Sequence, residues 1–320
     1  MPINGPSSYV PTLNEFLLHW PNVNTALGAP LVLPGGATLV LATAIRDQLE
    51  DFIASVQGKL NDVEIGRGQI EILKLAILER IGEFNRKVRG FLSHTAFVPA
   101  LPDVPSITSA APRIIEPLDD MANLWGKINA ATIPGFTGPL LLLGGYTLAA
   151  FNTDLTALKA TYTELQDANQ SLSLERLRRN EVQDQAYAIM RDYRSAVIGS
   201  LSPTDPLVLN LPRLSPLGGS TPAQVTATGV WNSATAQARI TWTESTAASL
   251  AQYEIRFCPG PDYSTDDETV VGSVDPTEPR EFLTLAGLPN PGSIASYKVY
   301  VITTEGNESG SSAVSVTRPD

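Results

Sequence analysis

The chain contains 320 residues, of which 43% are hydrophobic and 17% are charged. This composition is typical of a folded protein with two or three domains and argues against a disordered chain. The formal net charge is −11, which disfavours nucleic acid or an anionic membrane as the main partner, because phosphate binding needs clustered Lys and Arg. With one cysteine, Cys258, and two histidines, His19 and His94, neither an intrachain disulfide nor a zinc site is expected.

The first residues, Met1–Tyr9, contain no basic stretch followed by an apolar one, so we expect no secretory signal peptide. A membrane-spanning helix needs about 20 consecutive apolar residues. The nearest runs, Pro30–Ala44 and Pro139–Phe151, each contain a Gly pair and fall short of that length. A membrane is therefore not an expected partner.

An internal repeat with an offset of 109 residues is the most informative pattern. Residues 30–39 read Pro-Leu-Val-Leu-Pro-Gly-Gly-Ala-Thr-Leu, and residues 139–148 read Pro-Leu-Leu-Leu-Leu-Gly-Gly-Tyr-Thr-Leu. The same offset relates Leu49 to Leu158 and Phe84 to Tyr193. We predict two helical repeats, 1–110 and 111–219, and each of them ends in a Pro-rich extension.

Each repeat begins with a predicted short helix, about Thr12–Leu27 in the first copy and Pro117–Ala130 in the second. The Gly pair that follows predicts a tight turn, with Thr38 or Thr147 placed to cap the next helix. Neither Gly pair has the Lys-Ser/Thr ending of a phosphate loop, and neither forms G-x-G-x-x-G.

A long stretch with helical periodicity follows each turn. In the second copy the apolar positions advance in alternating steps of three and four, a heptad pattern, at Leu148, Phe151, Leu155, Leu158, Tyr162 and Leu165. Gly66 and Gly68 interrupt the first copy, and residues 169–173 interrupt the second, so we predict two antiparallel arms per copy and a four-helix bundle. One continuous helix through each interruption is the alternative.

Both copies end in apolar, Pro-rich segments, which we predict to be extended arms lying on a surface. The surface is either this bundle or a neighbouring subunit. The candidate interaction residues in these arms are Phe97, Val98, Leu101 and Val104 in the first, and Leu207, Val208, Leu209 and Leu211 in the second.

From about Ser220 the helical pattern stops and short alternating segments begin. Residues 238–242, 252–257 and 297–302 are predicted strands, separated by turn residues at a spacing typical of a β-sandwich. The predicted fold class is therefore a multidomain α and β protein: a duplicated α-helical hairpin bundle, then an all-β sandwich over residues 220–320.

Several residues in this last segment are in register with one family: Pro222, Trp242, Tyr253, Leu285-x-x-Leu288 before a Pro-Gly turn, Tyr297-x-Val299-x-Val301, Gly306–Ser311 and Arg318-Pro319. On these residues the segment resembles the fibronectin type III family. The resemblance implies a seven-stranded sandwich with Trp242 and Tyr253 in its core and Tyr297 as the corner tyrosine. The family's Arg-Gly-Asp adhesion tripeptide is missing from this sequence, and the shared fold alone says little about function.

No pattern of catalytic residues stands out. His19 and His94 are interpreted as structural, which leaves no base for a Ser or Cys nucleophile. The acidic loop at Asp262 and Asp266–Glu268 could hold Ca²⁺ weakly but is more typical of a solvated loop. Residues 175–181 are interpreted as a solvated helix face with weak ion pairs. We therefore expect no enzyme activity, no catalytic or metal-binding residues and no cofactor.

Three functions remain open. The first, which we favour, is a structural subunit of a self-assembled surface layer, filament, appendage or virion, whose partner is a second copy of the chain. The second is a binding module that recognises a protein or glycan through the sandwich, with Trp231 and Tyr263 as candidate exposed aromatics. The third is a membrane-active helical pore-former. The fibronectin-like resemblance favours an extracellular, cell-surface or virion location.

Overall fold

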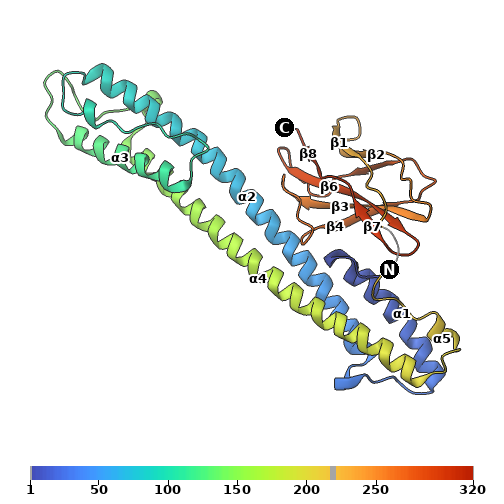
Figure 1. Cartoon of the computed structure of the whole chain (residues 1–320). Helices are drawn as coiled ribbons and strands as arrows, with labels where there is room; N and C mark the ends of the chain where they lie inside the picture. The colour runs from blue at the N-terminus through green and yellow to red at the C-terminus, as the bar shows by residue number, and fades with distance from the viewer. Residues whose placement is uncertain (1, 217–220, 320) are drawn as a thin grey trace. The chain divides into compact units, whose positions relative to one another are not determined.

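The computed structural model describes residues 2–216 and 221–319 and confirms a multidomain α and β fold (Figure 1). The helices are α1 (Tyr9–Leu27), α2 (Leu39–Phe91), α3 (Ala111–Ala130), α4 (Leu148–Ser200) and the short α5 (Pro206–Leu209). Antiparallel strands follow from residue 227 onward. None of the described helices combines the length and the hydropathy that a membrane crossing requires.

The prediction of two separate arms in each repeat is wrong, because α2 and α4 are continuous helices of 53 residues each. Gly66 and Gly68 weaken α2 by about 1 kcal/mol each relative to Ala. Burial of Val63, Ile70 and Ile77, spaced seven residues apart, holds this part of the helix in place. A side chain at position 66 would lie 3.3 Å from Leu165 of α4, so the glycine here permits close helix packing.

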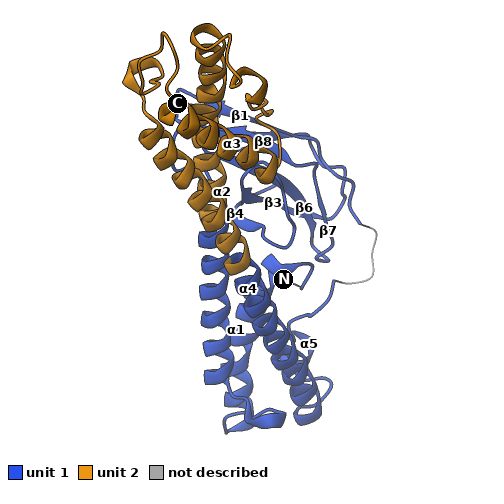
Figure 2. Ribbon diagram, turned by 90° about the vertical axis from the view of Figure 1, so that its left-hand side faces the viewer, with its two compact units in different colours: residues 1–60, 172–320 blue, residues 61–171 orange. Residues whose placement is uncertain are grey.

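The chain forms two compact units, residues 1–60 with 172–320 and residues 61–171 (Figure 2). Each long helix contributes residues to both units. The units therefore cut across the sequence repeats rather than following them. The predicted sandwich boundary at 219–220 lies outside the described residues.

Unit 2, residues 61–171, has a helical core in which α3 packs against the end of α2 and the start of α4. Unit 1 has an equivalent core, in which α1 packs against the start of α2 and the end of α4. Corresponding side chains are buried in the two cores: Leu13, Phe16, Trp20 and Val23 of α1 match Leu118, Met121, Trp125 and Ile128 of α3.

The repeated loops also match in detail. Asn24 accepts a hydrogen bond from the backbone N–H of Leu31, and Asn129 accepts one from Leu140, both at 2.8 Å. All four glycines of the two Gly pairs have positive φ, which only glycine adopts without strain. Thr147 accepts from the N–H of Ala150, and Thr38 from that of Leu41, so the predicted caps are confirmed. Positions 109 apart therefore occupy equivalent places.

The C-terminal part of unit 1 consists of two antiparallel sheets. One sheet has the order β1 (Ala227–Asn232), β2 (Gln237–Trp242), β5 (Glu281–Thr284). The other contains β4 (Thr269–Val274), β3 (Leu250–Pro259) and β6 (Ile294–Thr303), with both β7 (Glu308–Gly310) and β8 (Val314–Thr317) paired to β6. Trp242 and Tyr253 lie in the core between the sheets, as predicted.

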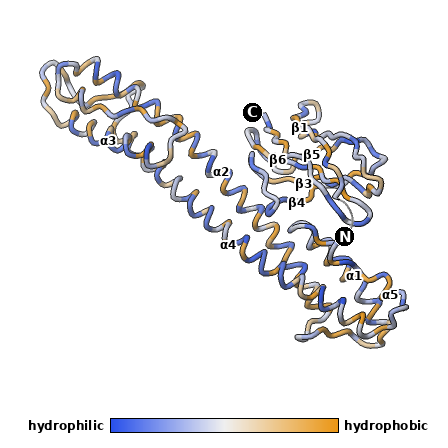
Figure 3. The backbone as a smooth tube through the Cα atoms, viewed as in Figure 1, coloured by the Kyte–Doolittle hydropathy of each residue, from blue (hydrophilic) through white to orange (hydrophobic). Residues whose placement is uncertain are grey.

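Hydrophobic and hydrophilic residues alternate along these strands and along both long helices (Figure 3). In β6 the alternation gives way to near-continuous burial, because both faces of this central strand are covered. One covered face belongs to the sandwich core. The other carries the polar network described next.

Candidate functional site

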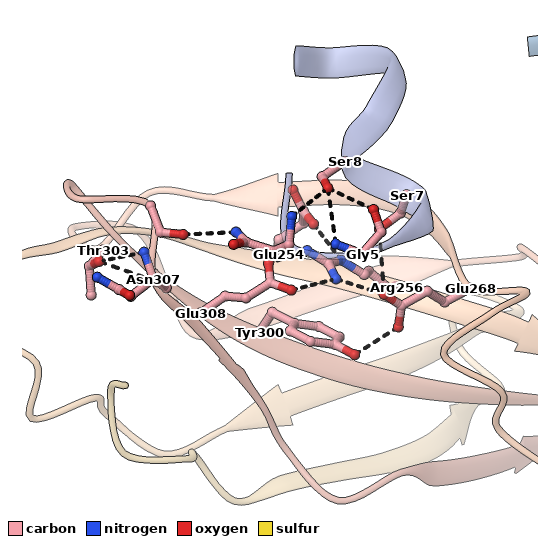
Figure 4. A network of polar contacts seen from close by, with 12 residues as sticks. Gly5, Ser7, Ser8, Glu254, Arg256, Glu268, Tyr300, Thr303, Asn307 and Glu308 are labelled. Carbon is pink, nitrogen blue, oxygen red and sulfur yellow. Dashed lines mark hydrogen bonds and ion pairs between the residues drawn. The ribbon is translucent and has the colours of Figure 1, made fainter. Parts of the chain in front are cut away.

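A buried charge network on the five-stranded sheet centres on Arg256 of β3, whose side chain is 1% exposed. Its guanidinium pairs with Glu254 at 2.5 Å, with Glu268 at 2.7 Å and with Glu308 at 2.7 Å (Figure 4). The guanidinium carbon also lies 3.8 Å from the centroid of the Tyr300 ring. Arg256 therefore combines three ion pairs with a cation–π contact in a site largely closed to water.

Two tyrosines complete the network around Glu268. The hydroxyls of Tyr263 and Tyr300 both donate to Glu268 Oε2, at 2.6 and 2.7 Å. Burial and the nearby Glu268 charge raise the pKa of both tyrosines above the ordinary value, so they remain protonated donors.

Burial and charge oppose each other at the centre of this network. Burial alone lowers the pKa of Arg256, but the hydrogen bond to Glu308 and the charges of the three glutamates raise it overall, so this arginine stays charged. Burial raises the pKa of Glu254 even though Arg256 acts in the opposite direction. One cation, Arg256, thus faces three carboxylates. Burial in this network disfavours the ionised form of Glu254.

The neighbouring Asp267 connects the sandwich to the helices of unit 1. Arg176 of α4 donates to both of its carboxylate oxygens, with Nε at 2.8 Å, and Arg179 lies 3.6 Å away. From α2, Gln57 donates to the backbone carbonyl of Asp267 at 2.7 Å. The predictions of a solvated acidic loop and of a solvated face at 175–181 are therefore wrong in part. Asp267, Glu268 and Arg179 are buried, whereas Asp262, Asp266, Arg178 and Glu181 are exposed.

Long-range pairing explains that error. The acidic loop and the arginines of α4 are separated by about ninety residues, and local spacing contains no sign that they meet. Within residues 2–216 and 221–319, no group of three His, Cys, Asp or Glu side chains is placed to hold a metal ion. The carboxylates are instead held by arginines and tyrosines.

The segment before α1 is also tied to the sandwich. Asn4 donates to the carbonyl of Gly306 at 2.8 Å, and Ser7 donates to Glu268 at 3.4 Å (Figure 4). The N–H of Ile3 donates to the carbonyl of Leu214 at 3.0 Å. Residues 3–7 thus join the end of the helical region to two loops of the sandwich.

His19 has a structural position, as its sequence context indicates. One ring nitrogen lies 2.7 Å from the hydroxyl of Tyr193 and the other 3.0 Å from the carbonyl of Leu207, so the ring joins α1 to α4 and α5. Burial lowers its pKa, although the Leu207 carbonyl opposes this. His94 is exposed beyond the end of α2.

The repeated loops present a second notable feature, two apolar surfaces that correspond at one exposed position, Val32 and Leu141. In unit 1, Leu31 and Leu33 are buried while Val32 between them is 57% exposed. In unit 2, Leu140 and Leu142 are buried while Leu141 is 39% and Leu143 is 67% exposed. We call Val32 with the neighbouring exposed Val40 and Leu41 the first loop surface, and Leu141 with Leu143 the second loop surface.

The candidate residues of the first Pro-rich arm mostly lie on their own unit. Phe97, Val98 and Leu101 are partly buried against the core of unit 2, while Val104 is exposed. A 3₁₀ turn, Val98–Ala100, interrupts the predicted extended course.

In the second arm, residues 206–209 form α5 instead of an extended segment, because Pro206 suits the first turn of a helix and Asp205 caps it through the N–H of Leu207. Leu211 is buried in the core of unit 1 and Leu207 and Val208 are partly buried there, whereas Leu209 is 71% exposed.

The two candidate aromatics of the sandwich are half-buried. Trp231 packs partly against the sandwich core, with the guanidinium of Arg318 5.7 Å from its ring centroid. Tyr263 lies beneath Lys298 and donates to Glu268. The pattern of free, exposed aromatics that typifies a ligand-binding face is not seen at these two positions.

Sequence reasoning missed the role of Arg256. A signal was present, since Glu254 and Arg256 alternate with the core residues Tyr253 and Ile255 and so face the other side of the strand. A charged stripe on the outer face of a strand ordinarily faces water, whereas here Arg256 is buried among Glu254, Glu268 and Tyr300.

Comparison with known proteins identifies no function for this chain. No protein family model and no curated protein matches the chain. Among solved structures, a fibronectin type III-like protein from Clostridium thermocellum matches with 18% identity and a TM-score of 0.25, over 32% of this chain and 97% of the other.

A pectate lyase from Erwinia chrysanthemi, solved with tetragalacturonic acid, matches with 22% identity and a TM-score of 0.25, over 29% of this chain. A pectate lyase from Pectobacterium carotovorum matches with 13% identity, also at a TM-score of 0.25. The matched region spans less than a third of either lyase chain. Likenesses this low assign no activity.

Proposed function

We propose that this chain is a non-enzymatic structural subunit that self-associates into a larger assembly through its two loop surfaces. The observation that carries the proposal is an apolar loop that is repeated in both units. In each copy two leucines are buried, and the apolar residue between them is exposed. The two surfaces have the same turn at the Gly pair and correspond at Val32 and Leu141. Val40, Leu41 and Leu143 have no apolar counterpart of similar size in the other copy, so each surface has its own shape. A chain with two contact surfaces can extend an assembly beyond a dimer.

The sandwich is interpreted as a fibronectin type III-like outer module. In support, the hydroxyl of Tyr297 donates to the carbonyl of Ala286 at 2.6 Å, the backbone contact expected of a corner tyrosine at the start of its strand. The pairing of β7 and β8 with β6 corresponds to a last strand divided in two. Such a module would project from the assembly while the helical units make its contacts.

Sedimentation velocity on loop-surface variants tests the proposal. Val32→Glu should disable the first surface, and the pair Leu141→Glu and Leu143→Glu the second, because a buried unpaired carboxylate opposes association. Either set alone should stop growth at small oligomers, and the two together should give a monomer. The control is Val230→Glu, at an equally exposed valine of the sandwich, which should assemble like the parent chain. Assembly that is unchanged in the combined variant would refute this role for the loops.

A further inference from the structure

The contacts that hold the sandwich on the helices of unit 1 use residues that recur in unit 2. Gln57 of α2 donates to the backbone carbonyl of Asp267, and Arg176 of α4 donates to its carboxylate. At the 109-residue offset of the repeat, Gln57 corresponds to Gln166 of α4, and Arg176 corresponds to Arg67 of α2. Unit 2 therefore contains the same glutamine and the same arginine at equivalent positions of the two long helices.

These two side chains lie at the surface of unit 2. Gln166 is exposed, and the Arg67 side chain is 52% exposed. Arg67 forms an ion pair with Glu64 of the same helix at 2.7 Å. An exposed pair of this kind contributes little to stability, so Arg67 can exchange Glu64 for a carboxylate of a partner at little cost.

A groove next to the sandwich recurs in the same way. In unit 1 it is lined by Glu15 of α1 and by residues 209–213 of the second arm, and the β6–β7 turn of the sandwich forms its other wall. In unit 2 the corresponding groove is lined by Asp120 of α3, the counterpart of Glu15, and by residues 99–103 of the first arm. The described residues that line this second groove all belong to unit 2, so the sandwich of the same chain forms no wall of it.

The two arms are also fixed at equivalent helix positions. Arg194 of α4 donates to the carbonyl of Pro212. Asn85 of α2, the position 109 residues earlier, donates to the carbonyl of Pro102 at 2.9 Å. The helices and arms therefore build the two grooves alike, and the sandwich lies against the one in unit 1.

We infer that unit 2 is a second docking site for the sandwich, which it accepts from a second copy of the chain. The occupant follows from unit 1, where the sandwich meets the same glutamine, the same arginine and the equivalent groove. The helical core of unit 1 and the core of the sandwich share no residue, so the sandwich can be exchanged between copies without opening either core. This contact extends the proposed self-association but uses residues other than those of the loop surfaces, so either can fail alone.

Cysteine cross-linking between two variants of the full chain tests the inference. One variant carries Gln166→Cys, and the other carries Asp266→Cys, at an exposed acid next to Asp267. With a short bismaleimide, their mixture should give a covalent dimer of twice 34.2 kDa, at least fivefold more than either variant alone. Glu164→Cys, exposed on the opposite side of α4, is the matched control and should give only background dimer with Asp266→Cys. A single chain with Gln57→Cys and Asp266→Cys should cross-link internally and shows that the reagent spans the contact.

Two charge changes in the Gln166→Cys variant locate the contact. Arg67→Glu should reduce the dimer yield at least fivefold, because it places a carboxylate opposite Asp267. Asp103→Arg should raise the yield about twofold, because it gives the unit 2 groove the arginine that the unit 1 groove has at position 213, facing Glu305 of the sandwich. The combined loop-surface variant should give an unchanged yield, which separates this contact from the loop surfaces. A mixture that gives only the dimer yield of the Glu164→Cys control, or a yield unaffected by Arg67→Glu, would overturn the inference.

Discussion

Arg256 is buried against three glutamates on the outer face of the five-stranded sheet, so its removal should be far more damaging than that of a surface arginine. Arg256→Ala would leave Glu254, Glu268 and Glu308 buried without their cation, which we expect to lower the free energy of unfolding by about 3–5 kcal/mol. Urea unfolding followed by near-ultraviolet circular dichroism measures this loss. Arg239→Ala breaks an exposed pair with Glu281 in the same sandwich and should unfold at the parent's urea concentration. Equal midpoints for both variants would contradict the account.

The pH dependence of Glu254 follows from the direction of its pKa shift. Burial raises the pKa of this carboxyl in the folded state, so its contribution to stability is present below the unfolded value of about 4.3 and is lost as pH rises through the folded pKa. Glu254→Gln mimics the protonated form. Its stability relative to the parent should therefore improve between pH 4 and pH 7, as measured by urea midpoints at the two values. A relative loss of stability over that interval would show that ionised Glu254 is favoured in the fold.

At the scale of single residues, the location of core residues could be predicted from the sequence better than the location of charged residues. Trp242, Tyr253 and Tyr297 could be placed because the segment resembles the fibronectin type III family, which implies a position for each of them. Asp267 and Arg179 could not be placed, because a charged residue in a loop or on a helix is ordinarily solvated. Their burial depends on a contact between segments far apart in the chain, which local patterns do not encode.

Among the helices, the glycines of α2 give a matched pair of substitutions. A Cβ at position 68 would meet no atom within 4 Å, so Gly68→Ala should stabilise α2 by about 0.5–1 kcal/mol through helix propensity alone. A Cβ at position 66 would lie 3.3 Å from Leu165, so Gly66→Ala should gain less or nothing. Hydrogen exchange of the amides around residues 63–75 measures the local opening free energy of each variant. A larger gain at 66 than at 68 would contradict the close packing of α2 against α4.

The continuity of α2 and α4 shows where element prediction failed. Gly66 and Gly68 favour a break on propensity alone, and residues 169–173 contain similar polar signals. Packing outweighs propensity here, since the seven-residue spacing of Val63, Ile70 and Ile77 continues across the glycines and buries all three. Periodicity that continues through a weak helix former was the better guide.

At the scale of the whole molecule, the repeat was the most dependable prediction. The offset of 109 residues places Leu31 with Leu140 and Leu33 with Leu142, all four buried, and leaves Val32 and Leu141 exposed. The compact units could not be predicted from the repeat boundaries, because each unit combines a short helix with parts of both long ones. A repeated sequence fixes which positions are equivalent but not which halves pack together.

We propose that the chain self-assembles through its two loop surfaces. Multi-angle light scattering of the unmodified full chain, over protein concentrations from about 1 to 500 µM, tests it most directly. The account predicts a molar mass that rises with concentration past twice the 34.2 kDa of the monomer, because each chain can bind two others. A constant mass of 34.2 kDa over the whole range would contradict it.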